Sequence, residues 1–140
     1  MSFMKFMMWH VDYFKAAPAD QGRSTLVETS DNLDVKNALL FFISFEKSDN
    51  DKYVDIIDKA VNEIQTISSK LGVYTLILNP YAHMFADLTD PDHAIKMLNL
   101  LEERLLQRNF KVYKMAFGRF YEIELKAKGH KLSRISRSIN

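Results

Sequence analysis

The segment covering residues 38–78 constrains the fold more than any other part of this chain. Residues 38–45 form an apolar run without alternation, which is typical of a central strand covered on both faces. Short polar residues at 48–51 are a helix-start signal, and apolar residues then recur at helical spacing up to Leu71, before Gly72 as the expected stop. Residues 73–78 form the next strand, so a strand–helix–strand unit with two parallel strands is predicted.

The flanking segments extend this unit to a mixed sheet with two long helices. Residues 3–14 are expected to form the first strand, and residues 15–34 a loop, with a short strand at 24–28 as an option. Asp90 and Pro91 open a second helix with a buried stripe, namely Ala94, Leu98, Leu101 and Leu105. Residues 110–115 and 119–127 form two strands, close enough in sequence for an antiparallel hairpin.

Composition bounds the class of protein. A chain of 140 residues predicts one domain, residues 1–140, with a core of its own. The absence of cysteine excludes disulfides, thiolate nucleophiles and cysteine metal sites, and it fits a cytoplasmic location. The first ten residues are apolar, but Lys5 and His10 interrupt them, so we interpret them as a strand rather than a signal peptide or membrane span.

General chemical motifs do not identify a reaction. The sequence holds no phosphate loop, dinucleotide glycine motif, zinc-protease helix or nucleophile elbow. The four histidines lie far apart in sequence and lack zinc-ligand spacing, so we expect neither a metal nor a cofactor. His10 and Asp12 share one face of the first strand, either as a catalytic or metal pair or as a hydrogen-bonded structural pair.

Two local features are candidates for ligand contact. Asn-Pro-Tyr-Ala-His at residues 79–83 ends a buried strand in a rigid turn, where α/β proteins often bind ligands. His83 lies either at the rim of such a site or on a plain surface. The segment after residue 126 is basic and lacks acids; it either contacts phosphate or is a solvated terminus.

Several motifs, taken together, resemble the N-terminal editing domain of archaeal-type threonyl-tRNA synthetases. Residues 79–83 resemble that family's Tyr-Pro-aromatic-Ala-His motif, and Ala-Phe-Gly-Arg-Phe at 116–120 resembles its Pro-Phe-Gly-aromatic-aromatic-Lys motif. Lys-Gly-His at 128–130 with Ser-Arg-Ser-Ile at 136–139 resembles its Lys-Gly-His-Pro-Leu-x-x-Leu-Ser-Arg segment. Residues 10–13 and 42–47 resemble its opening His-x-Asp-Tyr and its second strand, so the similarity covers nearly the whole chain in order.

The resemblance implies a D-aminoacyl-tRNA deacylase-like fold, a mixed sheet with two long helices, and a homodimer. It implies hydrolysis of serine from wrongly charged threonine tRNA, with backbone groups reading the substrate and the ribose hydroxyl of the tRNA assisting, and without metal or cofactor. The implied catalytic residues are Tyr121 and His83. The implied substrate-binding residues are Phe45, Glu46, Pro80, Tyr81, Ala82, Phe117, Gly118, Phe120 and His130, and the implied tRNA-binding residues are Lys128, Lys131, Arg134 and Arg137.

Departures from the family pattern bear on activity. Tyr121 stands where the family has lysine, so a neutral phenol replaces a cation. Lys131 and Arg134 stand in a segment where the family has Pro-Leu-x-Glu, so a carboxylate has become a cation. The alternative to an active deacylase is therefore a tRNA-binding or dimerisation module of the same fold. Either form could stand alone or be attached to a synthetase catalytic core.

Overall fold

The computed structural model describes residues 4–21, 32–46, 52–81 and 91–140, and at its centre lies β2 (Leu33–Phe45). Helix α1 (Tyr53–Leu71) follows and ends at Gly72, whose φ of 66° is the left-handed conformation that glycine adopts without strain. Strand β3 (Thr75–Pro80) then pairs with β2 in parallel, Leu39 opposite Leu76. The predicted strand–helix–strand unit is confirmed, whereas its predicted helix-start signal at 48–51 lies outside the described residues.

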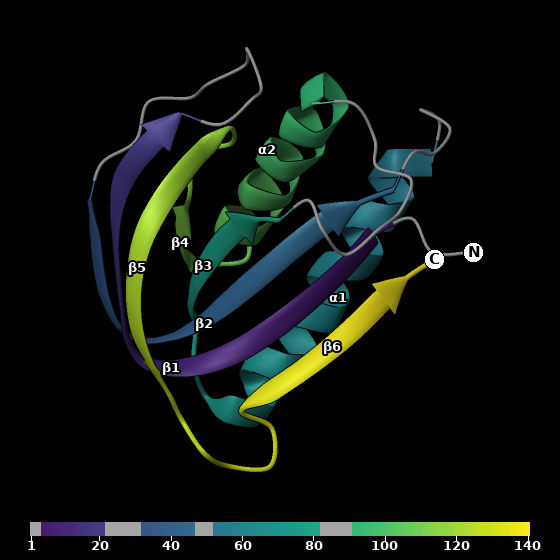
Figure 1. The fold of residues 1–140 in the computed structure, drawn as a ribbon. Helices are drawn as coiled ribbons and strands as arrows, with labels where there is room; N and C mark the ends of the chain where they lie inside the picture. Colours follow the sequence, from purple (N-terminus) through teal and green to yellow (C-terminus); the bar gives the residue numbers. More distant parts are fainter. Residues whose placement is uncertain (1–3, 22–31, 47–51, 82–90) are drawn as a thin grey trace.

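The other elements complete a six-stranded mixed sheet with both helices on one face (Figure 1). Its order is β4-β3-β2-β1-β5, and β6 also pairs with β1. Their bounds are Met4–Gln21 for β1, Pro91–Gln107 for α2, Lys111–Lys114 for β4, Arg119–Ala127 for β5 and Arg134–Ile139 for β6. The expected class, a mixed sheet with two long helices packed on it, is confirmed. No helix within the described ranges is long and apolar enough to cross a membrane.

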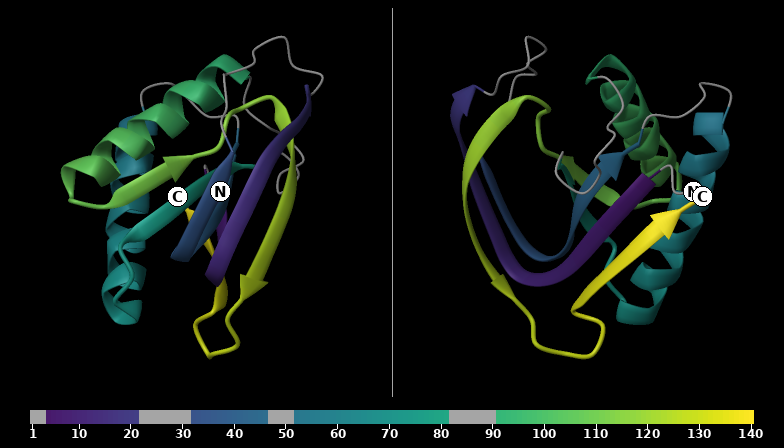
Figure 2. Two further views of the ribbon diagram at one scale, coloured as in Figure 1. Left: turned by 90° about the vertical axis from the view of Figure 1, so that its left-hand side faces the viewer. Right: turned by 45° about the vertical axis from the view of Figure 1, so that its right-hand side comes forward.

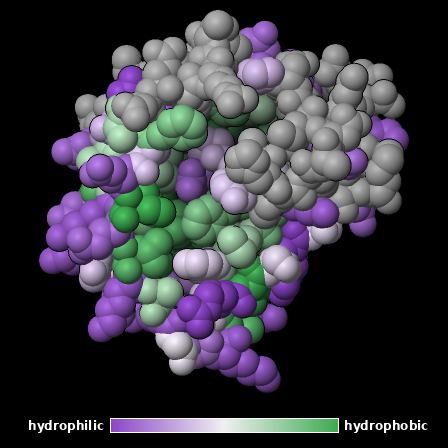
Figure 3. Space-filling model, in the orientation of Figure 1, coloured by the Kyte–Doolittle hydropathy of each residue, from purple (hydrophilic) through white to green (hydrophobic). Residues whose placement is uncertain are grey.

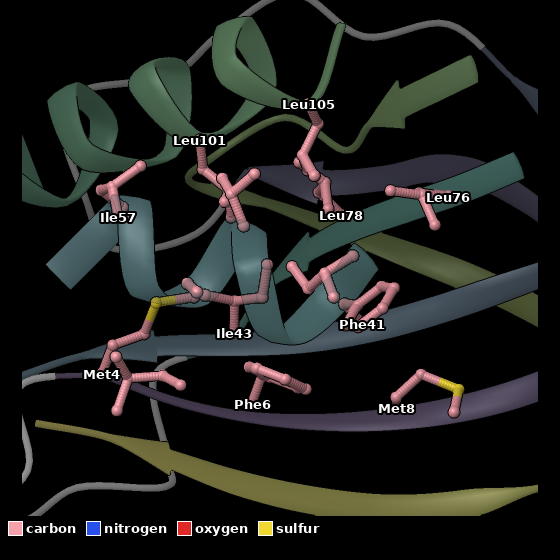
Figure 4. Close-up of a cluster of buried hydrophobic side chains, with 14 of the residues drawn as sticks. Met4, Phe6, Met8, Phe41, Ile43, Ile57, Leu76, Leu78, Leu101 and Leu105 are labelled. Carbon is pink, nitrogen blue, oxygen red and sulfur yellow. The ribbon is translucent and has the colours of Figure 1, made fainter. Parts of the chain in front are cut away.

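The main core lies between the sheet and the two helices (Figure 4). Alternate residues of β1, Met4, Phe6 and Met8, face this side and are fully or almost fully buried. From α2 the buried stripe is Met97, Leu98, Leu101 and Leu105, close to the prediction. Burial of these apolar faces fixes the helices against β2 and β3 and thereby makes the strand ends of the sheet rigid.

The opposite face of the sheet is concave, because β1 and β2 are long and strongly bent (Figure 2). A second cluster, built without helical residues, fills this curve; it includes Val11, Phe14, Leu40 and Met115. Val11 and Phe14 share a face although they are three residues apart, because a bulge between Val11 and Tyr13 shifts the strand alternation. Through the bend of β1 and β2, the concave face continues across the sheet to β5.

Two expectations about the sheet were wrong, and one strand was not foreseen. Residues 15–21 belong to β1 and residues 33–34 to β2 rather than to a loop, and Ala16 continues the buried face of β1 after the bulge. Strands β4 and β5 do not form a hairpin: β4 pairs with β3 and β5 pairs with β1, at opposite ends of the sheet order. The basic tail contains β6, which pairs with β1 and buries Ile139 against α1. The optional strand at 24–28 lies outside the described residues.

Candidate functional site

Two loops begin side by side at one edge of the sheet. Strands β3 and β4 are parallel neighbours, with Leu78 opposite Lys114, so their carboxyl ends point the same way. The backbone N–H of Met115 donates to the carbonyl of Leu78 at 2.8 Å, which joins the chain just after β4 to the last part of β3. The loops expected to carry substrate contacts, after Leu78 and after Met115, therefore adjoin each other.

The first loop is held by the end of β2. The N–H of Tyr81 donates to the carbonyl of Ile43 at 2.7 Å, and the hydroxyl of Ser44 donates to the carbonyl of Tyr81. Both backbone groups of Tyr81 are thus used inside the protein, whereas its side chain is 41% exposed. Pro80, half-buried, is the last residue of β3. Ala82 and His83 lie outside the described residues.

The second loop is short and closed on itself. Ala116 is buried, Phe117 is half-buried, and Gly118 has a φ of 82°, a left-handed conformation that side chains disfavour. Phe120 follows with 61% of its surface exposed. The N–H of Ala116 donates to the hydroxyl oxygen of Tyr121 at 2.7 Å, so Tyr121 of β5 ties the ends of the loop together.

Aromatic side chains continue from the first loop onto the concave face. The ring centroids of Tyr81 and Phe42 lie 5.9 Å apart, and those of Phe42 and Trp9 lie 5.6 Å apart, both edge to face. Apolar side chains gather on this helix-free face in Figure 3, bordered by polar ones. Sequence reasoning did not assign Trp9 or Phe42 to the site; the alternation that puts Met7 and Trp9 on one face was the available signal.

The second-strand residues expected at the site point in different directions. Phe45 is 4% exposed and packs in the helix-side core, opposite Met4 of β1. Its ring is therefore part of the core, and a contact between Phe45 and a substrate would have to use its backbone. Glu46 is half-buried just after β2, three residues beyond Ile43, which is the partner of Pro80.

His130 lies away from the two loops, in the connection between β5 and β6. Its Nε2 is 2.9 Å from Nδ1 of His10, and Nε2 of His10 is 2.9 Å from Oδ1 of Asn37. His10 pairs with Leu39, and Leu39 with Leu76, four residues or roughly 13 Å along β3 from Pro80. Within one chain, the structure therefore separates His130 from the loops and gives it a partner on β1.

Two of the four basic residues expected to contact tRNA pair with carboxylates of this chain. Lys128 donates to Asp12, and this hydrogen bond is the main cause that lowers the pKa of the Asp12 carboxyl below its usual value. Nε of Arg137 donates to Glu63 of α1 at 2.8 Å. Arg134 and Lys131 are exposed. His10 and Asp12 thus bond to different partners, and no group of three metal-ligating side chains occurs within the described ranges.

Comparison with known proteins shows the family of this chain. The family model described as the archaea-specific editing domain of threonyl-tRNA synthetase matches residues 4–139. The chain belongs to this editing-domain family. It is 36% identical over 140 residues to a threonine–tRNA ligase of Methanosphaera stadtmanae and 31% identical over 139 residues to one of Thermococcus onnurineus. Each match covers 97% of this chain.

The editing-domain match is to a part of longer proteins. The chain spans 22% of the length of both ligases. Among solved structures, the fold is similar to the c-Myc DNA Unwinding Element Binding Protein, with a TM-score of 0.66 and 10% identity, over 95% of this chain and 97% of that one. At that identity the likeness concerns the fold alone. The resemblance seen in the sequence motifs is confirmed for the family.

Proposed function

We propose that this protein hydrolyses the ester between serine and threonine tRNA, a proofreading reaction. The observation that carries the proposal is the bond from Met115 to Leu78, which brings together the two loops that the editing-domain motifs occupy. The esterified adenosine is proposed to lie between them and to stack on the rings of Tyr81 and Phe120. Aromatic faces stack on bases, and both side chains are exposed.

The proposed chemistry uses main-chain groups and the substrate itself. Water attacks the ester carbonyl carbon, the bond to the ribose oxygen breaks, and a proton passes to that oxygen, which leaves serine and free tRNA. The described parts of the two loops, residues 79–81 and 115–120, contain no serine, cysteine or lysine to serve as a nucleophile. The neighbouring ribose hydroxyl is proposed to assist the water, and fixed backbone dipoles to stabilise the developing charge. Ala82 and His83 complete the first loop in this proposal.

The proposed tRNA contacts follow the basic side chains after β5. Lys131 and Arg134 are exposed and suit phosphate groups, whereas Lys128 and Arg137 would have to exchange internal carboxylate partners. His130 is proposed to contribute from the same connection. Exposed charges attract one another only over a Debye length of about 10 Å, so these side chains are proposed to lie close to phosphate groups of the tRNA acceptor end.

We further propose a homodimer, attachment to a synthetase catalytic core and a cytoplasmic location. The exposed apolar side chain of Ile123 on β5, 46% exposed, supports a partner surface. Light scattering coupled to size-exclusion chromatography tests the dimer: two chains of 16.3 kDa give about 33 kDa. A mass of one chain across the micromolar range would contradict it.

A deacylation assay tests the function. Serine release from seryl-tRNA(Thr) is expected to be faster with the protein than without it, and threonine release from threonyl-tRNA(Thr) much slower. Phe120→Ala is expected to reduce serine release about tenfold, since stacking on one base contributes roughly 1–3 kcal/mol. The control is Tyr74→Ala, which removes a 50% exposed aromatic just before β3, at the other end of the strand. Release at the spontaneous rate, with tRNA still bound, would favour the non-catalytic module instead.

A further inference from the structure

The hydrogen bond between Ala116 and Tyr121 is an unusual way to hold a site loop. It joins a backbone N–H to a side-chain oxygen five residues later, at 2.7 Å. Between them lies Gly118 with its φ of 82°, and just before them Met115 is anchored to β3. The bond therefore closes the loop that carries Phe117 and Phe120, and it does so from inside, since Ala116 is 7% exposed.

The chemistry of the two groups makes the pairing specific. A phenol oxygen accepts a hydrogen bond, whereas a lysine ammonium has three donors and no acceptor, and a proline has no N–H to donate. The ring of Tyr121 packs against the concave-face cluster, which fixes the position of its oxygen. A buried N–H without a partner is costly, so the loop depends on an acceptor at this position.

We propose that Tyr121 is a positioning residue that acts through Ala116, rather than a substitute for a catalytic cation. It holds residues 116–120 in the conformation that presents the aromatic side chains to the adenosine, and this inference rests on the proposed function. Both positions depart from the motif that the chain resembles: alanine supplies an N–H where that motif has proline, and tyrosine supplies an acceptor where it has lysine. The two departures are complementary.

Steady-state kinetics with seryl-tRNA(Thr) tests the proposal. Tyr121→Phe keeps the ring and removes the acceptor, so KM is expected to rise about three- to tenfold with kcat within about twofold, the size of one neutral hydrogen bond. Tyr121→Lys is expected to show at least the same rise in KM. Tyr113→Phe is the matched control: Tyr113 packs on the same cluster, and no hydrogen bond of its hydroxyl is found among the described residues. It is expected to behave like the unaltered protein.

A double-variant cycle separates positioning from general stability. Ala116→Pro removes the N–H, so adding Tyr121→Phe to it is expected to change KM by less than about twofold. A loss of kcat at unchanged KM in Tyr121→Phe would make Tyr121 a catalytic residue and overturn the proposal. Additive effects in the cycle, or Tyr121→Phe kinetics equal to those of the unaltered protein, would also overturn it.

A second readout does not need turnover. Amide hydrogen exchange of Ala116 is expected to become about three- to tenfold faster in Tyr121→Phe and to stay unchanged in Tyr113→Phe. If the unaltered protein releases no serine, the proposed function fails, and this exchange rate still decides whether Tyr121 fixes the loop. Unchanged exchange at Ala116 would overturn the inference even in an active enzyme.

Discussion

Replacing Asn37 should destabilise the protein by an amount that depends on the replacement. Asn37 has a φ of 49°, and its Oδ1 pairs with Nε2 of His10, which is 6% exposed. The N–H of Leu132 donates to Nδ1 of His130 at 3.3 Å, which leaves the proton of a neutral His130 on Nε2, facing His10. His10 then carries its own proton on Nε2 and donates it to Asn37.

Two contributions set the magnitudes. Loss of the hydrogen bond costs about 1 kcal/mol, and more if the His10 N–H is left without water. An ordinary side chain in the left-handed region adds roughly 1–2 kcal/mol of strain, against roughly 0.5–1 kcal/mol of extra chain entropy for glycine. We therefore expect Asn37→Gly to lose about 1.5–2 kcal/mol and Asn37→Ala about 2–3 kcal/mol. Asn37→Asp keeps an acceptor and tolerates this backbone, so it should stay within about 0.5 kcal/mol.

Urea unfolding at neutral pH measures these differences in the free energy of unfolding. The thermal midpoint Tm should fall by about 3 °C for each kcal/mol lost in a chain of this size. The N–H groups of Lys128 and His10, which bond to the carbonyls of His10 and Ser133, should exchange faster in Asn37→Gly. Equal stability of the glycine and alanine variants would refute the strain contribution. If both matched the unaltered protein, the hydrogen bond to His10 would contribute nothing to folding.

Three further predictions concern the acid range, the core and tRNA binding. Because the pKa of Asp12 is lowered in the folded state, its stabilising effect is present above the usual carboxyl value near ~3.9 and is lost as pH falls through the lowered value. Asp12→Asn should therefore have a lower urea midpoint than the unaltered protein at pH 7, and the difference should narrow as the pH falls below the usual carboxyl value. Leu101→Ala, at a fully buried position, should cost about 3 kcal/mol in urea unfolding, whereas Leu106→Ala, 51% exposed, should cost less than about 0.5 kcal/mol. Arg134→Gln should reduce the salt dependence of tRNA binding by about one unit of slope in a filter-binding titration. Arg137→Gln should change it less, since that guanidinium is paired with α1; the reverse order would contradict the assignment of these contacts.

Local patterns were sufficient for the parallel unit at the centre of the sheet. The run over β2, the helical spacing of α1 and the stop at Gly72 each reflect burial or backbone conformation within a few residues. The adjacency of the two site loops was expected from the family resemblance alone, because the parallel pairing of β3 with β4 was not predicted from local patterns. The edge strands depend instead on long-range pairing, which single-sequence periodicity does not record.

Strand β6 illustrates the limit most clearly. Ile135 and Ile139 face the core, but the basic and serine residues around them made the segment look like a solvated tail. The bulge near Asp12 likewise has no local signal, and it separated His10 from the partner expected for it. The hydrogen bond from Ala116 to Tyr121 was also unforeseen, because a donor–acceptor match across a loop requires coordinates.

The most direct test of the account is to locate a bound seryl-adenosine mimic with a non-hydrolysable linkage by NMR. Amide resonances of Tyr81, Phe117, Gly118 and Phe120 should shift in a saturable titration, and those of α1 and α2 should not. Saturable shifts confined to the helices, or no binding at millimolar mimic, would contradict a site built between the loops that follow β3 and β4.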